Sequence, residues 1–272
     1  MLSQRVKAAL IFVPLVLILI YIGGWVFNLF IAVVLLLAAY EFIQLFKHIG
    51  YRPSFLTASA GMLLIVFQRW FFGEKYSGVF LTLLLTMVII VALIAYERGE
   101  KDPSFNMAIH LVVGFYLGWV GSFFILLRAM PEGLGWLLTA LPAAWLADAG
   151  AYTIGRWLGK RKMTPRLSPG KTWAGLLGGI ITGSLSGLLL LLLWRSVGFL
   201  AVDTPLWQGL VAGIVVSCLS PLGDLFISLI KRTANVKDTG NLIPGHGGVL
   251  DRIDTWIWAG MLGYYLILLF NR

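Results

Sequence analysis

Long apolar stretches, separated by short polar segments, run along the whole of this 272-residue chain. A helix needs about 20 mainly apolar residues to cross a lipid bilayer, and most of the stretches approach that length. The strand-like alternation of a membrane β-barrel is absent from the sequence. The pattern therefore predicts an all-α, polytopic integral membrane protein with about nine transmembrane helices, over residues 8–22, 25–46, 55–72, 77–96, 106–128, 134–155, 174–194, 209–230 and 255–270.

Basic residues test this count of helices. With a cytoplasmic N-terminus, the connections place 16 of the 21 Lys and Arg residues inside and five outside. Cytoplasmic loops carry an excess of Lys and Arg, so this distribution supports nine spans and a cytoplasmic N-terminus in the cell (inner) membrane. The net charge of +9 is explained mainly by this topology, with attraction to anionic membrane lipids as an addition. No nucleic-acid partner is predicted.

Polar residues divide the chain into two regions. Residues 1–130 are predicted to be N-terminal transmembrane helices, whose charged insert is the solvated connection from Glu97 to Phe105. Residues 131–272 hold the aspartates of the apolar runs and both long charged loops, and we predict that they form the catalytic region. No internal repeat is visible, which counts against the repeat-built transporter folds.

Glycines recur every fourth residue in the seventh apolar stretch, at Gly175, Gly179, Gly183 and Gly187. Residues at this spacing share one face of a helix, and glycine there lets another backbone approach closely. The stripe predicts tight helix packing, either within the chain or in a homodimer.

The segment from Ser228 to Asp254 concentrates charge that is expensive beside lipid. Basic side chains, carboxylates and a Pro-Gly-His-Gly-Gly turn occur together in it. Such a combination suits a polyphosphate held by Lys and Arg, by backbone N–H groups and by a divalent metal ion. The candidate phosphate-binding residues of the segment are Lys231, Arg232, Lys237, His246, Gly247, Gly248 and Arg252. His246 could instead cap the turn.

Four aspartates are candidate ligands for Mg²⁺, which favours oxygen donors. Asp224 lies in the eighth apolar stretch, where a carboxylate should face protein, water or a metal; an ion pair is its alternative role. Asp251 and Asp254, three residues apart, would share one face of the last helix, or merely cap it. Asp148 is a candidate ligand for a second cation, with a hydrogen bond from a Tyr or Ser as the alternative.

The motif Ser-Pro-Gly-Lys-Thr-Trp, from Ser168 to Trp173, predicts a helix start with Ser168 as N-cap and Pro169 at the first helical position. A helix N-terminus offers free N–H groups to a phosphate, and Lys171 would add a positive charge. Helix capping alone is the alternative, but it would not require the lysine.

The charged segment resembles the signature of the CDP-diacylglycerol synthases, also called phosphatidate cytidylyltransferases. The pattern is Ser-x-x-Lys-Arg, four residues, Lys-Asp-x-Gly, then Pro-Gly-His-Gly-Gly-x-x-Asp-Arg-x-Asp, and all its fixed positions are filled from Ser228 to Asp254. The resemblance extends over roughly residues 140–260, through Asp148–Tyr152, Ser168–Gly175 and Ser220–Asp224.

The resemblance implies a reaction of CTP with phosphatidic acid that gives CDP-diacylglycerol and diphosphate, with Mg²⁺ bound at the positions of Asp224 and Asp251. Lys171, Asp224 and Asp251 are then the expected catalytic residues, and Ser168 joins the substrate-binding set. Two positions depart from the pattern: many members carry glutamates where this chain has Ala174 and Ile227, so no role of those glutamates carries over.

Two other functions are weighed against this one. A CTP-dependent kinase of a polyprenol or phytol lipid would share the membrane and the nucleotide, but would release CDP instead of diphosphate. A cation transporter could use Asp148 and Asp224, but would leave the Pro-Gly-His-Gly-Gly loop unexplained.

Overall fold

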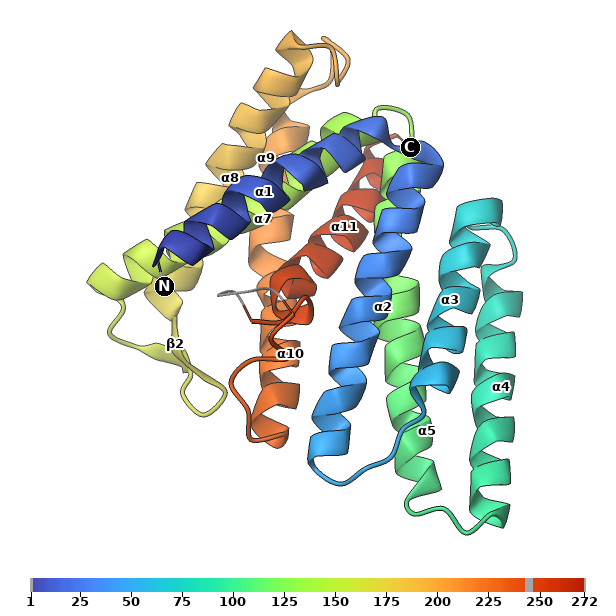
Figure 1. Cartoon of the computed structure of the whole chain (residues 1–272). Helices are drawn as coiled ribbons and strands as arrows, with labels where there is room; N and C mark the ends of the chain where they lie inside the picture. The colour runs from blue at the N-terminus through green and yellow to red at the C-terminus, as the bar shows by residue number, and fades with distance from the viewer. Residues whose placement is uncertain (1, 243–246, 272) are drawn as a thin grey trace. The chain divides into compact units, whose positions relative to one another are not determined.

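The computed structural model describes residues 2–242 and 247–271. It is mainly helical, and the chain divides into two compact units. The first unit comprises Met1–Leu126 and Ile230–Arg252, and the second comprises Leu127–Leu229 and Ile253–Arg272. The elements, most of which are labelled in Figure 1, are α1 (Leu2–Ile22), α2 (Gly24–His48), α3 (Phe55–Phe72), α4 (Ser77–Glu97), α5 (Pro103–Val112), the π-helix η1 (Val113–Val120), α6 (Phe123–Ala129), α7 (Gly133–Leu158), β1 (Lys162–Thr164), β2 (Ser168–Thr172), α8 (Trp173–Ser196), α9 (Leu206–Leu219), α10 (Pro221–Thr233) and α11 (Leu250–Phe270).

The N-terminal helices of the first unit pack through small residues and a buried apolar cluster. Ile65 of α3 packs with Leu84 and Val88 of α4. At Gly118 of η1, an added Cβ would lie 3.1 Å from the Met62 backbone of α3, so glycine permits that close approach. One continuous helix was expected over 106–128; the structure instead has α5, η1 and α6, in a stretch that glycines make less favourable for an α-helix.

Arg69 is a fully buried cation in the first unit. Its guanidinium pairs with Glu74 and lies 4.0 Å from the ring centroid of Trp119 and 4.5 Å from that of Phe123. A buried charge is tolerated only when it is paired, and aromatic faces add further attraction to a cation. This arrangement accounts for an arginine inside an apolar run.

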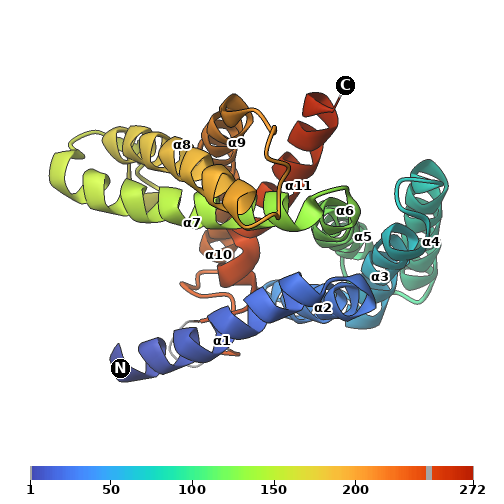
Figure 2. The same ribbon diagram turned by 90° about the horizontal axis from the view of Figure 1, so that it is seen from above.

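The glycine stripe of α8 packs within the second unit, where α7, α8 and α9 lie side by side (Figures 1 and 2). A Cβ added at Gly175 would lie 2.7 Å from the Ala151 carbonyl oxygen of α7. A Cβ at Gly187 would lie 2.3 Å from the Gly209 oxygen of α9. The predicted packing role of the stripe is therefore confirmed, and its partners are helices of the same chain.

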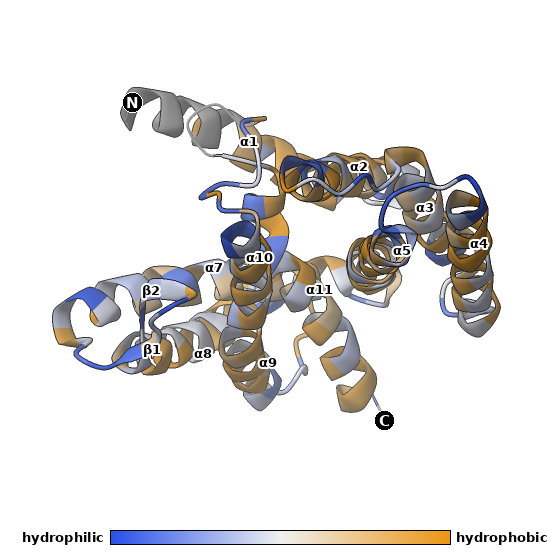
Figure 3. Ribbon diagram, turned by 90° about the horizontal axis from the view of Figure 1, so that it is seen from below, coloured by the Kyte–Doolittle hydropathy of each residue, from blue (hydrophilic) through white to orange (hydrophobic). Residues whose placement is uncertain are grey.

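Seven helical segments among the described residues are long and apolar enough to cross a membrane. The hydropathy colouring of Figure 3 shows apolar helices joined by polar segments. These spans confirm a polytopic membrane protein, and they are Gly24–His48, Phe55–Phe72, Ser77–Glu97, Pro103–Ala129, Trp173–Ser196, Leu206–Thr233 and Leu250–Phe270.

The other two predicted spans form helices that fall outside these seven. The described apolar part of α1 is short, Phe12–Ile22. The helix α7 has 26 residues, but Ala, Gly, Thr, Asp148 and Arg156 make it less apolar than the other spans. The span Leu206–Thr233 is broken at Ser220, because Pro221 cannot donate a backbone hydrogen bond and begins α10. Asp224 therefore lies in the first turn of a helix.

Candidate active site

The predicted helix start at Ser168 is wrong, because Ser168–Thr172 is a strand. It pairs antiparallel with Lys162–Thr164, so the fold contains a small hairpin that the all-α prediction did not include. The helix α8 begins at Trp173, and its N-cap is Thr172, whose hydroxyl accepts the Gly175 N–H at 3.1 Å. Threonine, next to the apolar run, therefore forms the cap in place of Ser168.

Lys171 and Asp224 form an ion pair in the second unit. The Lys171 Nζ lies 2.6 Å from Asp224 Oδ2, and the two side chains are 24% and 32% exposed. The same ammonium is 3.5 Å from the Pro221 carbonyl oxygen, and Asp224 Oδ1 accepts a 3.4 Å hydrogen bond from Ser228. Ion pairing, the alternative considered for Asp224, is thus what the structure contains, and both side chains remain accessible.

Asp148 of α7 belongs to the same group of charges. It is half-buried, interacts electrostatically with Lys171 and Asp224, and accepts a hydrogen bond from the Thr255 side chain. Tyr152, the hydrogen-bond donor considered from the sequence, is exposed. Two carboxylates and one ammonium therefore gather where β2 and the start of α10 approach α7.

A second lysine–carboxylate pair lies in the first unit. Lys231 Nζ is 2.6 Å from Asp251 Oδ1, with side chains only 12% and 6% exposed. The other oxygen, Oδ2, accepts hydrogen bonds from the Thr239 N–H at 2.8 Å, the Thr239 hydroxyl at 3.0 Å and the Gly248 N–H at 3.2 Å. Asp251 thereby ties the end of α10, the loop after it and the start of α11 together.

Glu41 of α2, absent from the predicted site, is hydrogen bonded to the same loop. It is 2% exposed. Its Oε1 accepts the Val249 N–H at 2.8 Å, and its Oε2 accepts the Leu250 N–H and the Thr239 hydroxyl, each at 2.9 Å. The available signal was a lone carboxylate inside an apolar run, the feature that marked Asp148 and Asp224.

The other predicted residues differ in exposure. Arg232, Lys237 and Arg252 are exposed, and Ser168 is partly so. Asp254 is buried, and its Oδ1 accepts the Thr255 N–H at 2.7 Å. His246 lies outside the described residues. Ile227, one of the positions that depart from the family pattern, is fully buried.

Gly247 and Gly248 occupy positions where a side chain would not fit easily. Gly247 has a φ of +81°, a conformation that L-residues rarely adopt, and a Cβ there would lie 3.2 Å from Asp251 Oδ2. A Cβ on Gly248 would lie 2.3 Å from Glu41 Oε2 and 2.1 Å from Thr239 Oγ1. Both glycines allow the loop backbone to close around these carboxylates.

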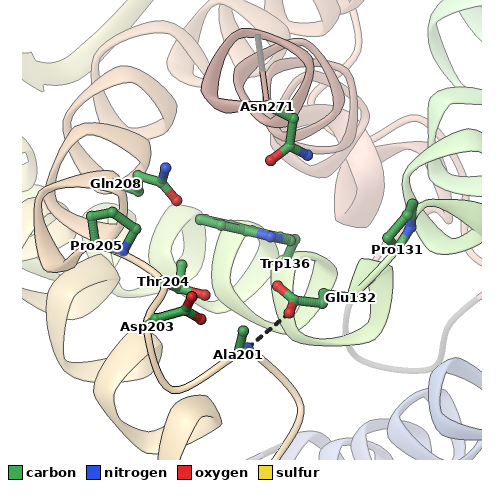
Figure 4. A pocket seen from close by; sticks show the side chains of 9 residues that line it. All are labelled: Pro131, Glu132, Trp136, Ala201, Asp203, Thr204, Pro205, Gln208 and Asn271. Atoms are coloured by element: carbon green, nitrogen blue, oxygen red, sulfur yellow. Dashed lines mark hydrogen bonds between the residues drawn. The ribbon is translucent and has the colours of Figure 1, made fainter.

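Within the described residues, no three His, Cys, Asp or Glu side chains are grouped closely enough to hold a metal ion by themselves. The pairs above offer carboxylate oxygens, the donors that Mg²⁺ prefers. A cavity of about 430 Å³ in the second unit contains none of the predicted site residues. Figure 4 shows its lining, in which Glu132 accepts the Ala201 N–H at 2.8 Å.

Helices of membrane-spanning length, with lysine–carboxylate pairs at helix ends, define an integral membrane protein that carries a charged polar site. The chain belongs to the cytidylyltransferase family, whose model matches residues 3–270. It is 31% identical to a phosphatidate cytidylyltransferase of Synechocystis, over 98% of this chain and 97% of that protein. Similar proteins of the same name occur in Pseudomonas aeruginosa, at 34% identity over 94% and 93%, and Haemophilus influenzae, at 33% over 94% of each.

Proposed function

We propose that the chain transfers the cytidylyl group of CTP to phosphatidate and releases diphosphate. This proposal rests on two ion pairs, Lys171–Asp224 and Lys231–Asp251. Their residues belong to the motifs that resemble those of the CDP-diacylglycerol synthases. An ammonium has three donors and a single carboxylate partner uses only part of them, so each lysine can also bind a phosphate oxygen. The family match and the near full-length relatives support the same reaction.

The reaction needs no protein nucleophile. A phosphate oxygen of phosphatidate attacks the α-phosphorus of CTP and forms a new P–O bond. The bond from the α-phosphorus to the oxygen bridging to the β-phosphorus breaks, and diphosphate leaves with the electron pair. Catalysis therefore depends on in-line alignment and on stabilising the negative charge that develops. We assign alignment of the phosphates to Lys171 and Lys231, and further phosphate contacts to Arg232, Lys237 and Arg252.

Mg²⁺ is the cofactor that the family resemblance implies, and the donor chemistry of the chain fits it. The Asp224 side chain is accessible, and its Oδ1 accepts a long hydrogen bond, at 3.4 Å, from Ser228. Asp251 Oδ1 already faces a cation, the Lys231 ammonium. We propose that Asp224 and Asp251 each contribute to Mg²⁺ binding, with Asp254 as a further candidate ligand and Asp148 as a candidate ligand for a second cation. When bound, Mg²⁺ supplies charge neutralisation to the phosphates.

The proposed topology has nine spans and a cytoplasmic N-terminus in the cell membrane. The seven apolar spans are supplemented by α1 and α7, and the excess of basic residues on one side supports the orientation. In this topology the hairpin β1–β2 and the loop between α10 and α11 both face the cytoplasm. CTP and the phosphatidate headgroups of the inner leaflet are available on that side.

Product analysis tests the proposed reaction. Purified protein is incubated with CTP labelled at the α-phosphorus, phosphatidic acid and Mg²⁺. The expected result is label in CDP-diacylglycerol, with one diphosphate released per turnover. In a parallel incubation with a polyprenol in place of phosphatidic acid, labelled CDP together with a phosphorylated alcohol would instead identify a lipid kinase. Protein denatured before the incubation is the control.

A further inference from the structure

Glu41 is a buried carboxylate that the reaction described above does not use. It lies on α2, some two hundred residues along the chain from three hydrogen-bond donors of the segment from Ser228 to Asp254. These donors are Thr239, Val249 and Leu250. Burying a carboxylate is expensive unless hydrogen bonds replace its hydration. Its position is therefore determined by this loop.

The donors that Glu41 satisfies belong to the start of α11. The first N–H groups of a helix have no partner inside the helix, and the N-terminus carries partial positive charge. Leu250 is the first residue of α11 and Val249 precedes it, so Glu41 caps this helix from another part of the chain. The residue after Leu250 is Asp251, so the cap fixes the backbone that carries the proposed metal ligand.

Thr239 connects the two carboxylates directly. Its hydroxyl lies 2.9 Å from Glu41 Oε2 and 3.0 Å from Asp251 Oδ2, while its N–H donates to Asp251. One hydroxyl carries one proton, so the Glu41 and Asp251 carboxylates compete for it. The orientation of the Asp251 carboxylate therefore depends on Glu41 through Thr239.

Glycines on both sides of the loop leave space for the Glu41 side chain. A Cβ at Gly240 would lie 2.8 Å from Glu41 Oε1, and one at Gly248 would lie 2.3 Å from Oε2. The loop thus closes around this carboxylate, and a side chain at either glycine would have to displace it.

We propose that Glu41 is a positioning residue of the active site: it caps α11 and holds Thr239, and so sets the Asp251 carboxylate against Lys231 for binding of the metal and phosphates. This inference rests on the proposed cytidylyl transfer. It makes a residue of the N-terminal helices part of the catalytic machinery.

The test compares Glu41→Gln with Glu132→Gln, a change of another glutamate that accepts a backbone N–H group, that of Ala201. In Glu41→Gln an amide NH₂ replaces one acceptor oxygen, so it faces N–H donors and cannot satisfy both. Mutation of a residue that orients a metal ligand typically lowers metal affinity or activity by about 10–100-fold. We expect a kcat reduced by that factor, a half-saturating Mg²⁺ concentration raised about tenfold, and a KM for phosphatidate changed less than about twofold. Glu132→Gln should leave all three near wild type.

Hydrogen exchange of the protein without metal or CTP provides a readout independent of activity. The amides of Thr239, Val249 and Leu250 should exchange faster in Glu41→Gln and at wild-type rates in Glu132→Gln. Unchanged exchange would overturn the inference, and so would faster exchange with unchanged kinetics, which would make Glu41 a purely structural cap. If the wild-type protein showed no cytidylyl transfer, the proposed function would be refuted. Hydrogen exchange would still report on the contacts between Glu41 and the residues it binds.

Thr239 variants keep the inference testable if Glu41→Gln does not fold. Thr239→Ser keeps the hydroxyl between the two carboxylates, whereas Thr239→Val removes it at similar volume. We expect Thr239→Ser to retain most of the activity and Thr239→Val to show the raised Mg²⁺ requirement. Equal activity of the two variants would show that the contact between Glu41 and Asp251 through Thr239 does not position the ligand.

Discussion

At the scale of single residues, the site consists of carboxylates that are each satisfied in a different way. Among the described residues, Asp251 has four donors around its two oxygens and is nearly buried, whereas Asp224 pairs with a lysine and remains accessible. Mg²⁺ usually binds through one or two carboxylates and retains water molecules. The accessible Asp224 is therefore suited to meet a solvated ion, and the tightly held Asp251 is suited to provide a fixed ligand.

Replacing either carboxylate by its amide should abolish turnover. Asp224→Asn and Asp251→Asn keep the side-chain shape but remove the negative charge that binds the metal ion, and with it the neutralisation of the phosphates by that ion. CDP-diacylglycerol formation across a Mg²⁺ titration measures the effect, and the thermal midpoint in detergent shows whether each variant folds. A folded variant with near-normal activity at low Mg²⁺ would remove that aspartate from the metal site.

Lys171 should contribute to the transition state more than to folding, because its side chain is partly exposed. Lys171→Ala should lower kcat/KM by about 100-fold, equivalent to about 2.7 kcal/mol. Lys171→Arg should restore little of this, since a planar guanidinium does not replace a compact ammonium. Steady-state kinetics with both substrates provide the measurement. An alanine variant as active as wild type would show that Lys171 has no catalytic role beyond its ion pair with Asp224.

At the scale of helices and strands, apolar length and glycine spacing were sufficient to predict most helices and the face that α8 packs. Two local features were not predictable in this way. The hairpin at Ser168 depends on pairing with Lys162–Thr164, which competes with helix capping by the same residues. Glu41 is a site residue only because the fold brings α2 to the start of α11, a contact between distant parts of the sequence.

The packing of α8 on α9 predicts a position-specific effect of added methyl groups. Gly187→Ala places a Cβ where the Gly209 oxygen would be 2.3 Å away, whereas Gly78 of α4 has no atom within 4 Å of an added Cβ. Overpacking of this kind costs about 1–3 kcal/mol. We expect a lower thermal midpoint for Gly187→Ala and an unchanged or higher one for Gly78→Ala, both measured in the same detergent. Equal midpoints would contradict close contact of α8 with α9.

At the scale of the whole molecule, each compact unit is built from two separate segments of the chain. Ile230–Arg252, which includes most of the signature segment, belongs with the N-terminal helices, and Lys171, Asp148 and Asp224 belong to the other unit. The helices α10 and α11 each contribute residues to both units. The two groups of residues can act on the same substrates only if the membrane topology places them on the same side.

Cysteine labelling of intact cells tests that topology. In a Cys218→Ala background, single cysteines replace Gly170 of β2, whose Cβ would meet no atom within 4 Å, and the exposed residues Asn241 and Asp203. With nine spans and a cytoplasmic N-terminus, cysteines at 170 and 241 should react with a membrane-impermeant maleimide only after permeabilisation, and one at 203 should react at once. If only one of positions 170 and 241 were external, Lys171 and Asp251 would lie on opposite sides of the membrane. They could then not act on the same phosphates, and the mechanism would be excluded.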